Sequence, residues 1–220
     1  PSAKQYLNDK KIKLIFKKDK PCKSVEKNIK DGVKVFMPKY VDLNGGLYDK
    51  KPEYMTQLYA NKLVCKDNKR IVFRGKLDTL QSKILEVQIL CKNLNENNVL
   101  KELEEVLVFV RKILASEVLE NEFIFDKLIE LSSDELRTHS HNPKKYFNRE
   151  HIIFPSVEMG PIIVALNSLR AQSREVEISA YKAFKDQEGK PTRPDIAIAL
   201  NRLSSCFYIM MCKYSAKRYK

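Results

Sequence analysis

Several features that would place this chain in a simple class are missing from its sequence. The longest uninterrupted apolar run is far shorter than the roughly 18 residues of a membrane span, so we expect no membrane partner. No secretory pattern opens the chain, which favours a cytoplasmic location. There is no internal repeat and no low-complexity tract. The 220 residues therefore predict one large domain, or one domain with an appendage.

Paired cysteines are also missing. The five cysteines are odd in number, form no CxxC motif and mostly lie in apolar surroundings; they are Cys22, Cys65, Cys91, Cys206 and Cys212. This pattern indicates buried free thiols in a reducing compartment. Their spacing would be unusual for a zinc site, so we expect no metal ligands among them.

Acidic residues are scarce in the first third of the chain. The net charge is +13, and residues 1–70 hold 18 Lys and Arg against 8 Asp and Glu. A nucleic-acid partner would explain a basic segment. The lysines are scattered, however, and no recognised nucleic-acid motif accompanies them. We therefore expect no nucleic-acid partner, and a phosphate-bearing ligand explains the charge equally well.

Residues 1–55 differ in pattern from the rest and predict a small α/β or irregular appendage. Residues 11–16 and 33–37 have the composition of short strands, and residues 42–53 form a turn-rich connection. We place the domain boundary here, with a helical domain over residues 56–220.

The helical domain shows apolar residues spaced by threes and fours. In the first helix, from about residue 70, they fall at positions 73, 77, 80, 84, 87 and 91. Four more helices are expected: one capped by Asn97 or Asn98, one in "SSDELRTHSH" with a serine cap, one from Pro161 to Phe184, and one from about Pro194. The fold class is thus mainly α, a five-helix bundle.

Charged residues interrupt the apolar pattern of the fourth helix. Arg170, Arg174 and Glu177 are spaced i, i+4 and i+7 and share one face. They are either a solvent-facing stripe with an Arg174–Glu177 ion pair or a row that binds an anion.

Polar residues also interrupt two other helices. Asn201 and Tyr208 share one side of an apolar helix, so we expect a buried Asn201 that bridges helices or binds a ligand. Asp78 follows Arg74 by four residues and lies close to the apolar face. It is either a surface residue or the partner of an arginine on another helix.

Three stretches together, "FRGKLDTLQS", "LRAQSREVE" and "RPDIAIALNRLSS", resemble the corrinoid adenosyltransferases, which transfer an adenosyl group from ATP to cobalamin. The resemblance covers about residues 52–218 and is nearest to the ethanolamine-utilisation branch. It implies a five-helix bundle, assembled as a homo-oligomer, with the trimer favoured. It also implies ATP bound between subunits with Mg2+, and cobalamin as the corrinoid substrate.

The resemblance assigns a role to each polar interruption. Asp78 and Arg174 would form an ion pair between neighbouring subunits beside ATP. Arg170 would lie near the phosphates, Glu177 near the ribose or its metal, and Asn201 would hold the nucleotide.

The sequence departs from the family pattern near the phosphates. Relatives of the propanediol type carry a second arginine where this chain has Ile178, so a phosphate contact would come from Arg170 or Lys62. Thr56 and Lys66 match the segment that closes over the triphosphate. "MTQLYANK" stands there in place of a glycine-rich loop.

Two further assignments concern the cobalt and metals. Relatives use an aromatic residue to displace the lower axial ligand of cobalt; here Phe154 is that residue or plain core filling. Some ethanolamine-type enzymes carry a thiol cluster where this chain has "YVDLN", residues 40–44, so we expect no structural metal. The "HSH" of residues 139–141 is either a polar loop or a metal site.

The resemblance favours an enzyme, a transferase acting on ATP and cob(I)alamin for ethanolamine utilisation. Its expected partners are a reductase and an adenosylcobalamin-dependent lyase, and a bacterial microcompartment is one expected location. The alternative is an ATP- or corrinoid-binding carrier or sensor without turnover. A nucleic-acid-binding protein with a basic arm is a third reading.

Overall fold

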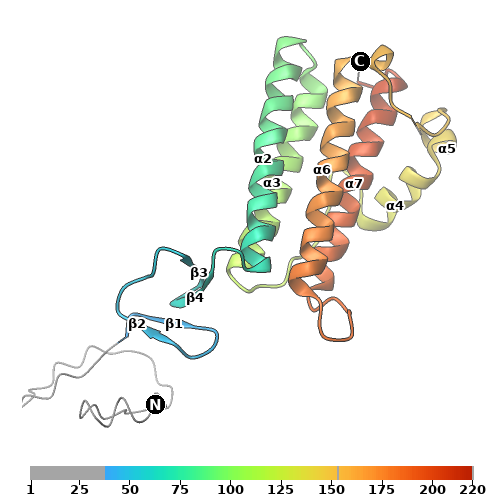
Figure 1. Cartoon of the computed structure of the whole chain (residues 1–220). Coiled ribbons are helices and arrows are strands. Elements are labelled where there is room, and N and C mark those ends of the chain that lie inside the picture. Colours follow the sequence, from blue (N-terminus) through green and yellow to red (C-terminus); the bar gives the residue numbers. More distant parts are fainter. Residues whose placement is uncertain (1–37, 153, 220) are drawn as a thin grey trace, which may run out of the picture.

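A computed structural model describes residues 38–152 and 154–219 of the chain. A small four-stranded sheet precedes a bundle of helices (Figure 1). The strands are β1 (Tyr40–Asp42), β2 (Leu47–Tyr48), β3 (Met55–Tyr59) and β4 (Lys62–Cys65). The helices are α2 (Lys69–Asn93), α3 (Asn97–Val118), α4 (Ser133–His141), α5 (Pro143–Phe147), the 3-10 turn η1 (Val157–Met159), α6 (Pro161–Phe184) and α7 (Pro194–Ser215).

The expected mainly α bundle is confirmed. Four long helices, α2, α3, α6 and α7, run side by side, with the short α4 and α5 against α7 (Figure 1). The five predicted helices are all present. The sixth, α5, begins at Pro143, where the sequence predicted only an end of the preceding helix, because proline suits a first helical turn.

Local signals set most of the helix ends. Ser132 and Glu135 form a reciprocal capping box at the start of α4. α6 and α7 begin at Pro161 and Pro194, as predicted. The start of α3 differs, because Glu96 is the capping residue and makes no side-chain cap bond. Its carboxylate instead accepts a hydrogen bond of 2.6 Å from the Tyr214 hydroxyl.

The core runs along the whole bundle. All six predicted apolar positions of α2 are buried, from Phe73 to Cys91. Cys91, Cys206 and Cys212 are buried free thiols, as expected, whereas Cys65 is exposed at the end of β4. Burial raises the pKa of Cys91 to about 11. In the described ranges α7 alone is long and apolar enough to cross a membrane; most of that stretch is buried in the bundle, as in a core helix.

The sheet extends further along the chain than the predicted appendage. Its strand order is β2-β1-β4-β3, with β1 parallel to β4 and the other pairs antiparallel. The expected domain boundary at residues 55/56 falls inside β3, and the helical part begins at Lys69. The strands predicted at residues 11–16 and 33–37 lie outside the described residues.

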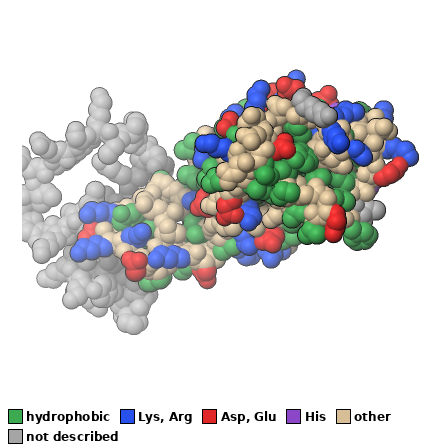
Figure 2. Space-filling view, turned by 90° about the horizontal axis from the view of Figure 1, so that it is seen from above, with side chains coloured by type: hydrophobic (Ala, Val, Ile, Leu, Met, Phe, Trp, Pro, Cys, Tyr) green, Lys and Arg blue, Asp and Glu red, His purple; other side chains and the backbone are tan. Residues whose placement is uncertain are grey.

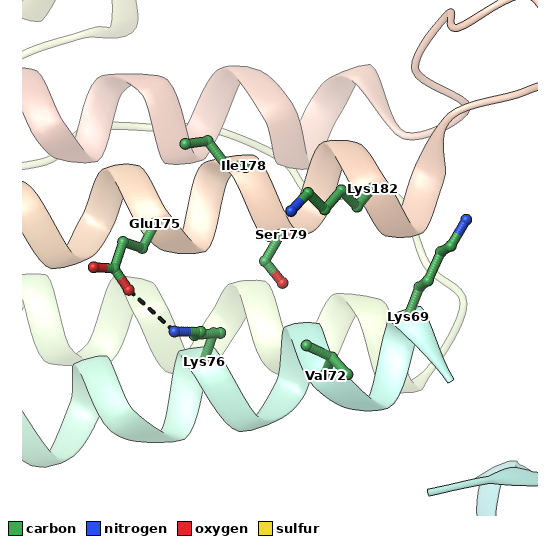
Figure 3. Close-up of a pocket in the computed structure, with 7 residues that line it drawn as sticks. All are labelled: Lys69, Val72, Lys76, Glu175, Ile178, Ser179 and Lys182. Atoms are coloured by element: carbon green, nitrogen blue, oxygen red, sulfur yellow. Dashed lines mark hydrogen bonds and ion pairs between the residues drawn. The ribbon is translucent and has the colours of Figure 1, made fainter. Parts of the chain in front are cut away.

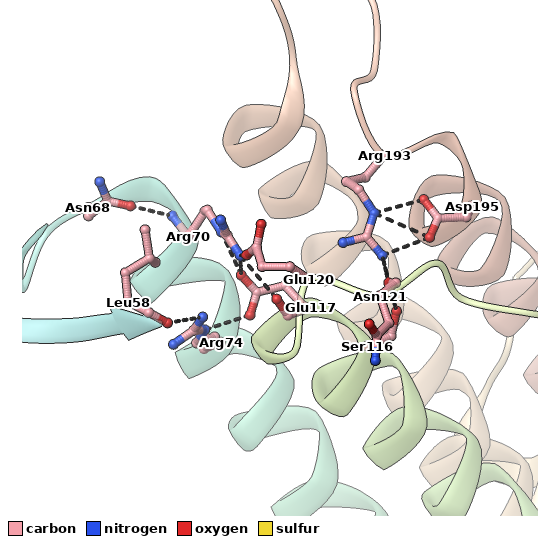
Figure 4. Close-up of polar contacts among 10 residues, drawn as sticks. All are labelled: Leu58, Asn68, Arg70, Arg74, Ser116, Glu117, Glu120, Asn121, Arg193 and Asp195. Atoms are coloured by element: carbon pink, nitrogen blue, oxygen red, sulfur yellow. Dashed lines mark hydrogen bonds and ion pairs between the residues drawn. The ribbon is translucent and has the colours of Figure 1, made fainter. Parts of the chain in front are cut away.

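A buried ion-pair network joins the sheet to the bundle (Figure 4). Glu117 of α3 is fully buried and accepts hydrogen bonds of 2.6 Å from both Arg70 and Arg74 of α2. Arg74 also donates to the Leu58 carbonyl of β3 at 2.7 Å. The partner of Arg74 is therefore Glu117, and not Asp78 one turn further along α2.

Seen from above, apolar side chains lie among charged ones on the surface of the bundle (Figure 2). The exposed apolar residues of the described chain include Ile89, Phe154 and Val157. Because a folded surface is always partly apolar, single exposed apolar residues do not by themselves indicate a binding surface.

Candidate functional site

A polar pocket of about 550 Å³ lies between α4, α6 and α7. Four residues predicted for the site line it together: Arg170, Arg174, Glu177 and Asn201. The other lining residues are Arg137, Ser140, His141, Arg202, Ser204, Ser205 and Tyr208. The spacing on α6 explains this geometry, because Leu166, Leu169 and Val176 point into the core and leave the charged face toward the pocket.

A chain of hydrogen bonds crosses the pocket from α6 to α4. The Asn201 amide donates to the Glu177 carboxylate at 3.0 Å. Arg202 donates to the Asn201 side-chain oxygen at 2.6 Å and to the Ser133 hydroxyl at 3.1 Å. These bonds hold the Asn201 amide in one orientation, with its nitrogen toward Glu177.

Asn201 is exposed, so the expectation of a buried amide is wrong. The helix around it is apolar on its other sides, and Leu200 and Leu203 are fully buried. The pocket opens one strip of α7 to solvent, which the composition of the helix did not reveal.

The pocket is strongly basic. Four arginines line it, and among the lining residues Glu177 is the single carboxylate. Burial and the charge of Arg137 lower the pKa of Arg202. Arg170 donates twice to the Asn167 side-chain oxygen, at 3.1 and 3.0 Å. The exposed Arg174 guanidinium lines the pocket and forms no ion pair with another described residue. Such a surface suits an anion with planar, forked acceptors, above all a phosphate.

Tyr208 of α7 also lines the pocket. Its hydroxyl accepts a hydrogen bond of 3.1 Å from the Ile152 amide and lies 3.1 Å from His151 Nδ1. Burial raises the pKa of Tyr208, so the phenol is neutral at pH 7.

The cobalamin adenosyltransferase family model matches residues 48–214, which include β3, β4 and all the residues that line the pocket. The chain belongs to the cobalamin adenosyltransferase family.

Individual relatives agree with this membership. The chain is 32% identical over 172 residues to the corrinoid adenosyltransferase EutT of Salmonella typhimurium strain LT2, a match that covers 76% of this chain and 61% of the relative. It is also 32% identical over 166 residues to EutT of Escherichia coli K12, covering 74% and 59%. The match thus spans about three fifths of the relatives' length. Comparison with solved structures gives no significant match.

Within this family member, Asp78 lies apart from the pocket. It is exposed on α2, and its carboxylate accepts a weak hydrogen bond from Gln81 at 3.3 Å. Asp78 and Arg174 do not meet within one chain, and both are accessible to another molecule. The pair predicted between subunits stays a prediction.

Thr56 and Lys62 belong to the sheet, Lys66 lies in the turn directly after β4, and none of the three lines the pocket. Lys66 pairs with Glu53 at 3.3 Å on the surface, and Lys62 is half-buried at the start of β4. One chain alone therefore does not bring these residues to Arg170 and Arg174. Their assignment to the triphosphate also stays a prediction.

Phe154 is 86% exposed and lies in the loop between α5 and η1. The reading of Phe154 as core filling is therefore wrong. It does not line the pocket either, so its predicted position beneath the cobalt is a separate proposal.

The two histidines of "HSH" diverge on α4. His139 stacks on Tyr146 with ring centroids 3.8 Å apart, and burial lowers its pKa. His141 lines the pocket. In the part of the chain that the structure describes, no three His, Cys, Asp or Glu side chains cluster as metal ligands do. A metal in the pocket would have the Glu177 carboxylate as its protein ligand, which fits an ion that takes its other oxygens from phosphate or water.

Sequence reasoning missed Arg137 and Arg202. Arg137 lies one turn before His141 on α4, and this i, i+4 spacing could have marked a shared basic face. Arg202 follows Asn201 directly, and nothing in its local pattern reveals that it would orient the amide beside it.

Proposed function

We propose that this chain is an ATP:cob(I)alamin adenosyltransferase that makes adenosylcobalamin for ethanolamine utilisation. The observation that carries the proposal is the arginine-lined pocket, in which Glu177 and Asn201 are already hydrogen-bonded, in a member of this family.

The reaction needs no covalent nucleophile from the protein. Cobalt(I) donates its electron pair to the 5′ carbon of ATP, the cobalt–carbon bond forms, and the bond from that carbon to oxygen breaks. Triphosphate leaves with the electron pair. The work of the protein is to position the reactants and to stabilise the charge on the leaving group.

Four residues of the pocket have a part in this work. Arg170 holds the phosphates by forked hydrogen bonds, and Arg174 lies beside the nucleotide. Asn201 and Glu177 hold the ribose side of the nucleotide. Mg2+ would be held by Glu177 with phosphate oxygens, and when bound it neutralises phosphate charge.

We also propose the assembly and the remaining contacts. The active form is a cytoplasmic homo-oligomer, with a trimer favoured, in which Asp78 pairs with Arg174 of a neighbouring subunit. Thr56, Lys62 and Lys66 close over the triphosphate across that interface. Phe154 displaces the lower axial ligand of the corrinoid, and a reductase supplies the electron that makes cobalt(I). An adenosylcobalamin-dependent lyase takes the product.

The test is the absorbance of chemically reduced cob(I)alamin mixed anaerobically with the protein, ATP and Mg2+. The cob(I)alamin band should be replaced by that of adenosylcobalamin, with one triphosphate released per corrinoid. Omission of ATP should abolish the change. Tight binding of ATP and corrinoid without any spectral conversion would overturn the proposal in favour of a carrier.

A further inference from the structure

A second groove lies on a different side of α6, between α6 and α2 (Figure 3). It has a volume of about 280 Å³ and shares no lining residue with the arginine pocket. It is lined by Lys69, Val72, Lys76, Glu175, Ile178, Ser179 and Lys182. Three lysines face one carboxylate there, so the groove attracts anions.

A buried hydroxyl inside this groove lacks a partner. Ser179 is only 8% exposed, and its Oγ makes no hydrogen bond within the described residues. In Figure 3 the hydroxyl points from α6 toward α2, between the lysine side chains. A buried hydroxyl without a partner is costly, and an anionic oxygen is a strong acceptor for it.

The lysines of the groove are also available. Lys76 pairs with Glu175 at 3.0 Å, but both side chains are about half exposed, so the pair is weak and an anion can compete for the ammonium group. Within residues 38–152 and 154–219, no carboxylate forms an ion pair with Lys69 or Lys182. Lys69 is the first residue of α2, and Lys182 lies in the last turn of α6.

We propose that this groove binds a polyphosphate anion through Ser179 and the ammonium groups of Lys69, Lys76 and Lys182. An extended anion with several charges matches cations spread along two helices, whereas a single phosphate would reach only some of them. The source of the anion rests on the proposed function, because adenosyl transfer both consumes a triphosphate ester and releases free triphosphate.

The test is calorimetric titration of the full chain with tripolyphosphate, without cobalamin. Lys76→Gln, Lys182→Gln and Ser179→Ala should each weaken binding about tenfold, the range for losing one charge-assisted hydrogen bond. Lys83→Gln is the matched control, because Lys83 lies on the same helix α2 but pairs with Glu86 away from the groove; its affinity should change less than about twofold. Ser179→Ala should keep or raise the melting temperature, because the buried hydroxyl has no partner to lose.

Parallel titrations with ATP distinguish the two sources. Loss of tripolyphosphate affinity alone means that the groove holds the free anion. Equal loss for ATP means that the groove holds the triphosphate of the nucleotide and that the arginine pocket does not; both outcomes support the site. Unchanged affinity in all three groove variants, or an equal loss in Lys83→Gln, overturns it. Because binding is measured without turnover, a protein that binds tripolyphosphate here but transfers no adenosyl group keeps this site and loses the proposed function.

Discussion

The Asn201 side chain shows how one amide can be oriented before any ligand arrives. Arg202 donates to its oxygen and Glu177 accepts from its nitrogen, so rotation of the amide would break both bonds. A nucleotide that binds beside it meets a fixed donor and acceptor, and less rotamer freedom is lost on binding.

Asn201→Ala should therefore raise the KM for ATP about tenfold, the effect of one or two hydrogen bonds, and leave the KM for cobalamin nearly unchanged. Because the side chain is exposed, the free energy of unfolding should change by less than about 0.5 kcal/mol. Steady-state kinetics with each substrate varied, together with urea unfolding, check both statements. A lower stability with an unchanged KM for ATP would make Asn201 a structural residue.

Asp42 lies within residues 40–44, where some ethanolamine-type relatives carry a thiol cluster and where we expect no structural metal in this chain. Its carboxylate accepts hydrogen bonds from the Asn44 and Gly46 amides, at 2.7 and 2.9 Å, and from the Tyr48 hydroxyl at 2.9 Å. These bonds close the turn between β1 and β2, and together they lower the pKa of Asp42.

We expect protein stripped with a strong chelator, and then given Mg2+ alone, to keep its full activity. Metal analysis of the purified protein is the companion measurement. Stoichiometric zinc or iron that copurifies, with activity that disappears on its removal, would contradict this expectation.

Among the elements, the junction of α2, α3 and the sheet depends on one carboxylate. Removing a partner from a buried ion pair leaves an uncompensated charge and costs about 3–5 kcal/mol. Glu117→Ala should lower the free energy of unfolding by about this amount, because Arg70 and Arg74 both lose their buried partner. Urea denaturation measures it.

Glu175→Ala is the matched control for this change. It also removes a glutamate that pairs with a lysine of α2, but on the surface. Such exposed pairs contribute about 0–1 kcal/mol. Equal losses in the two variants would show that the Glu117 network does not hold the elements together.

Asp195, at the start of α7, should make the free energy of unfolding depend on pH in the acid range. Burial alone would raise the pKa of Asp195, but hydrogen bonds from Arg193 and from the Phe123 amide outweigh burial and hold the pKa below its ordinary 3.8. The folded state thus favours the charged form. Its contribution is present above pH 3.8 and is lost as the pH falls through the lower folded pKa.

Asp195→Asn should accordingly be less stable than the parent protein at pH 7, and the difference should shrink below pH 3.8. Urea unfolding of both proteins at pH 7, 4 and 3 measures it. A difference that stays constant across this range would assign the loss to geometry and not to charge.

The helices were predictable because their signals are local. The period of apolar residues from Phe73 to Cys91 reports one-sided burial, and Ser132, Pro161 and Pro194 set ends by local hydrogen bonding and sterics. The pairing of β1 with β4 and the burial of Glu117 depend on distant residues, which no local pattern specifies. The α6 side of the pocket was predictable from spacing, whereas Arg137 reaches it only through the packing of α4.

At the scale of the whole molecule, one chain provides two separated halves of the predicted site. Arg174 and Glu177 face the pocket, whereas Asp78, Lys62 and Lys66 do not line it. A site built between neighbouring copies would reunite them, which is the arrangement proposed above.

Mixing two inactive variants tests this arrangement. Asp78→Asn and Arg174→Ala should each reduce turnover strongly, because a pair buried between subunits would leave one charge alone at a cost of about 3–5 kcal/mol. Co-refolded mixtures should contain some interfaces with both native residues and so regain part of the activity. Mixed oligomers that regain none would place the pair elsewhere. The double variant Asp78→Arg with Arg174→Asp should recover assembly better than activity.

The carboxylate that Arg70 and Arg74 share also limits how this sequence can drift over generations. A neutral residue at position 117 would leave two arginines without their buried partner, and loss of either arginine would leave the glutamate half satisfied. Single steps away from the present trio thus pass through unstable intermediates. Positions 70, 74 and 117 should change in concert among descendants of this chain or stay fixed, whereas the exposed pair at positions 83 and 86 should vary freely.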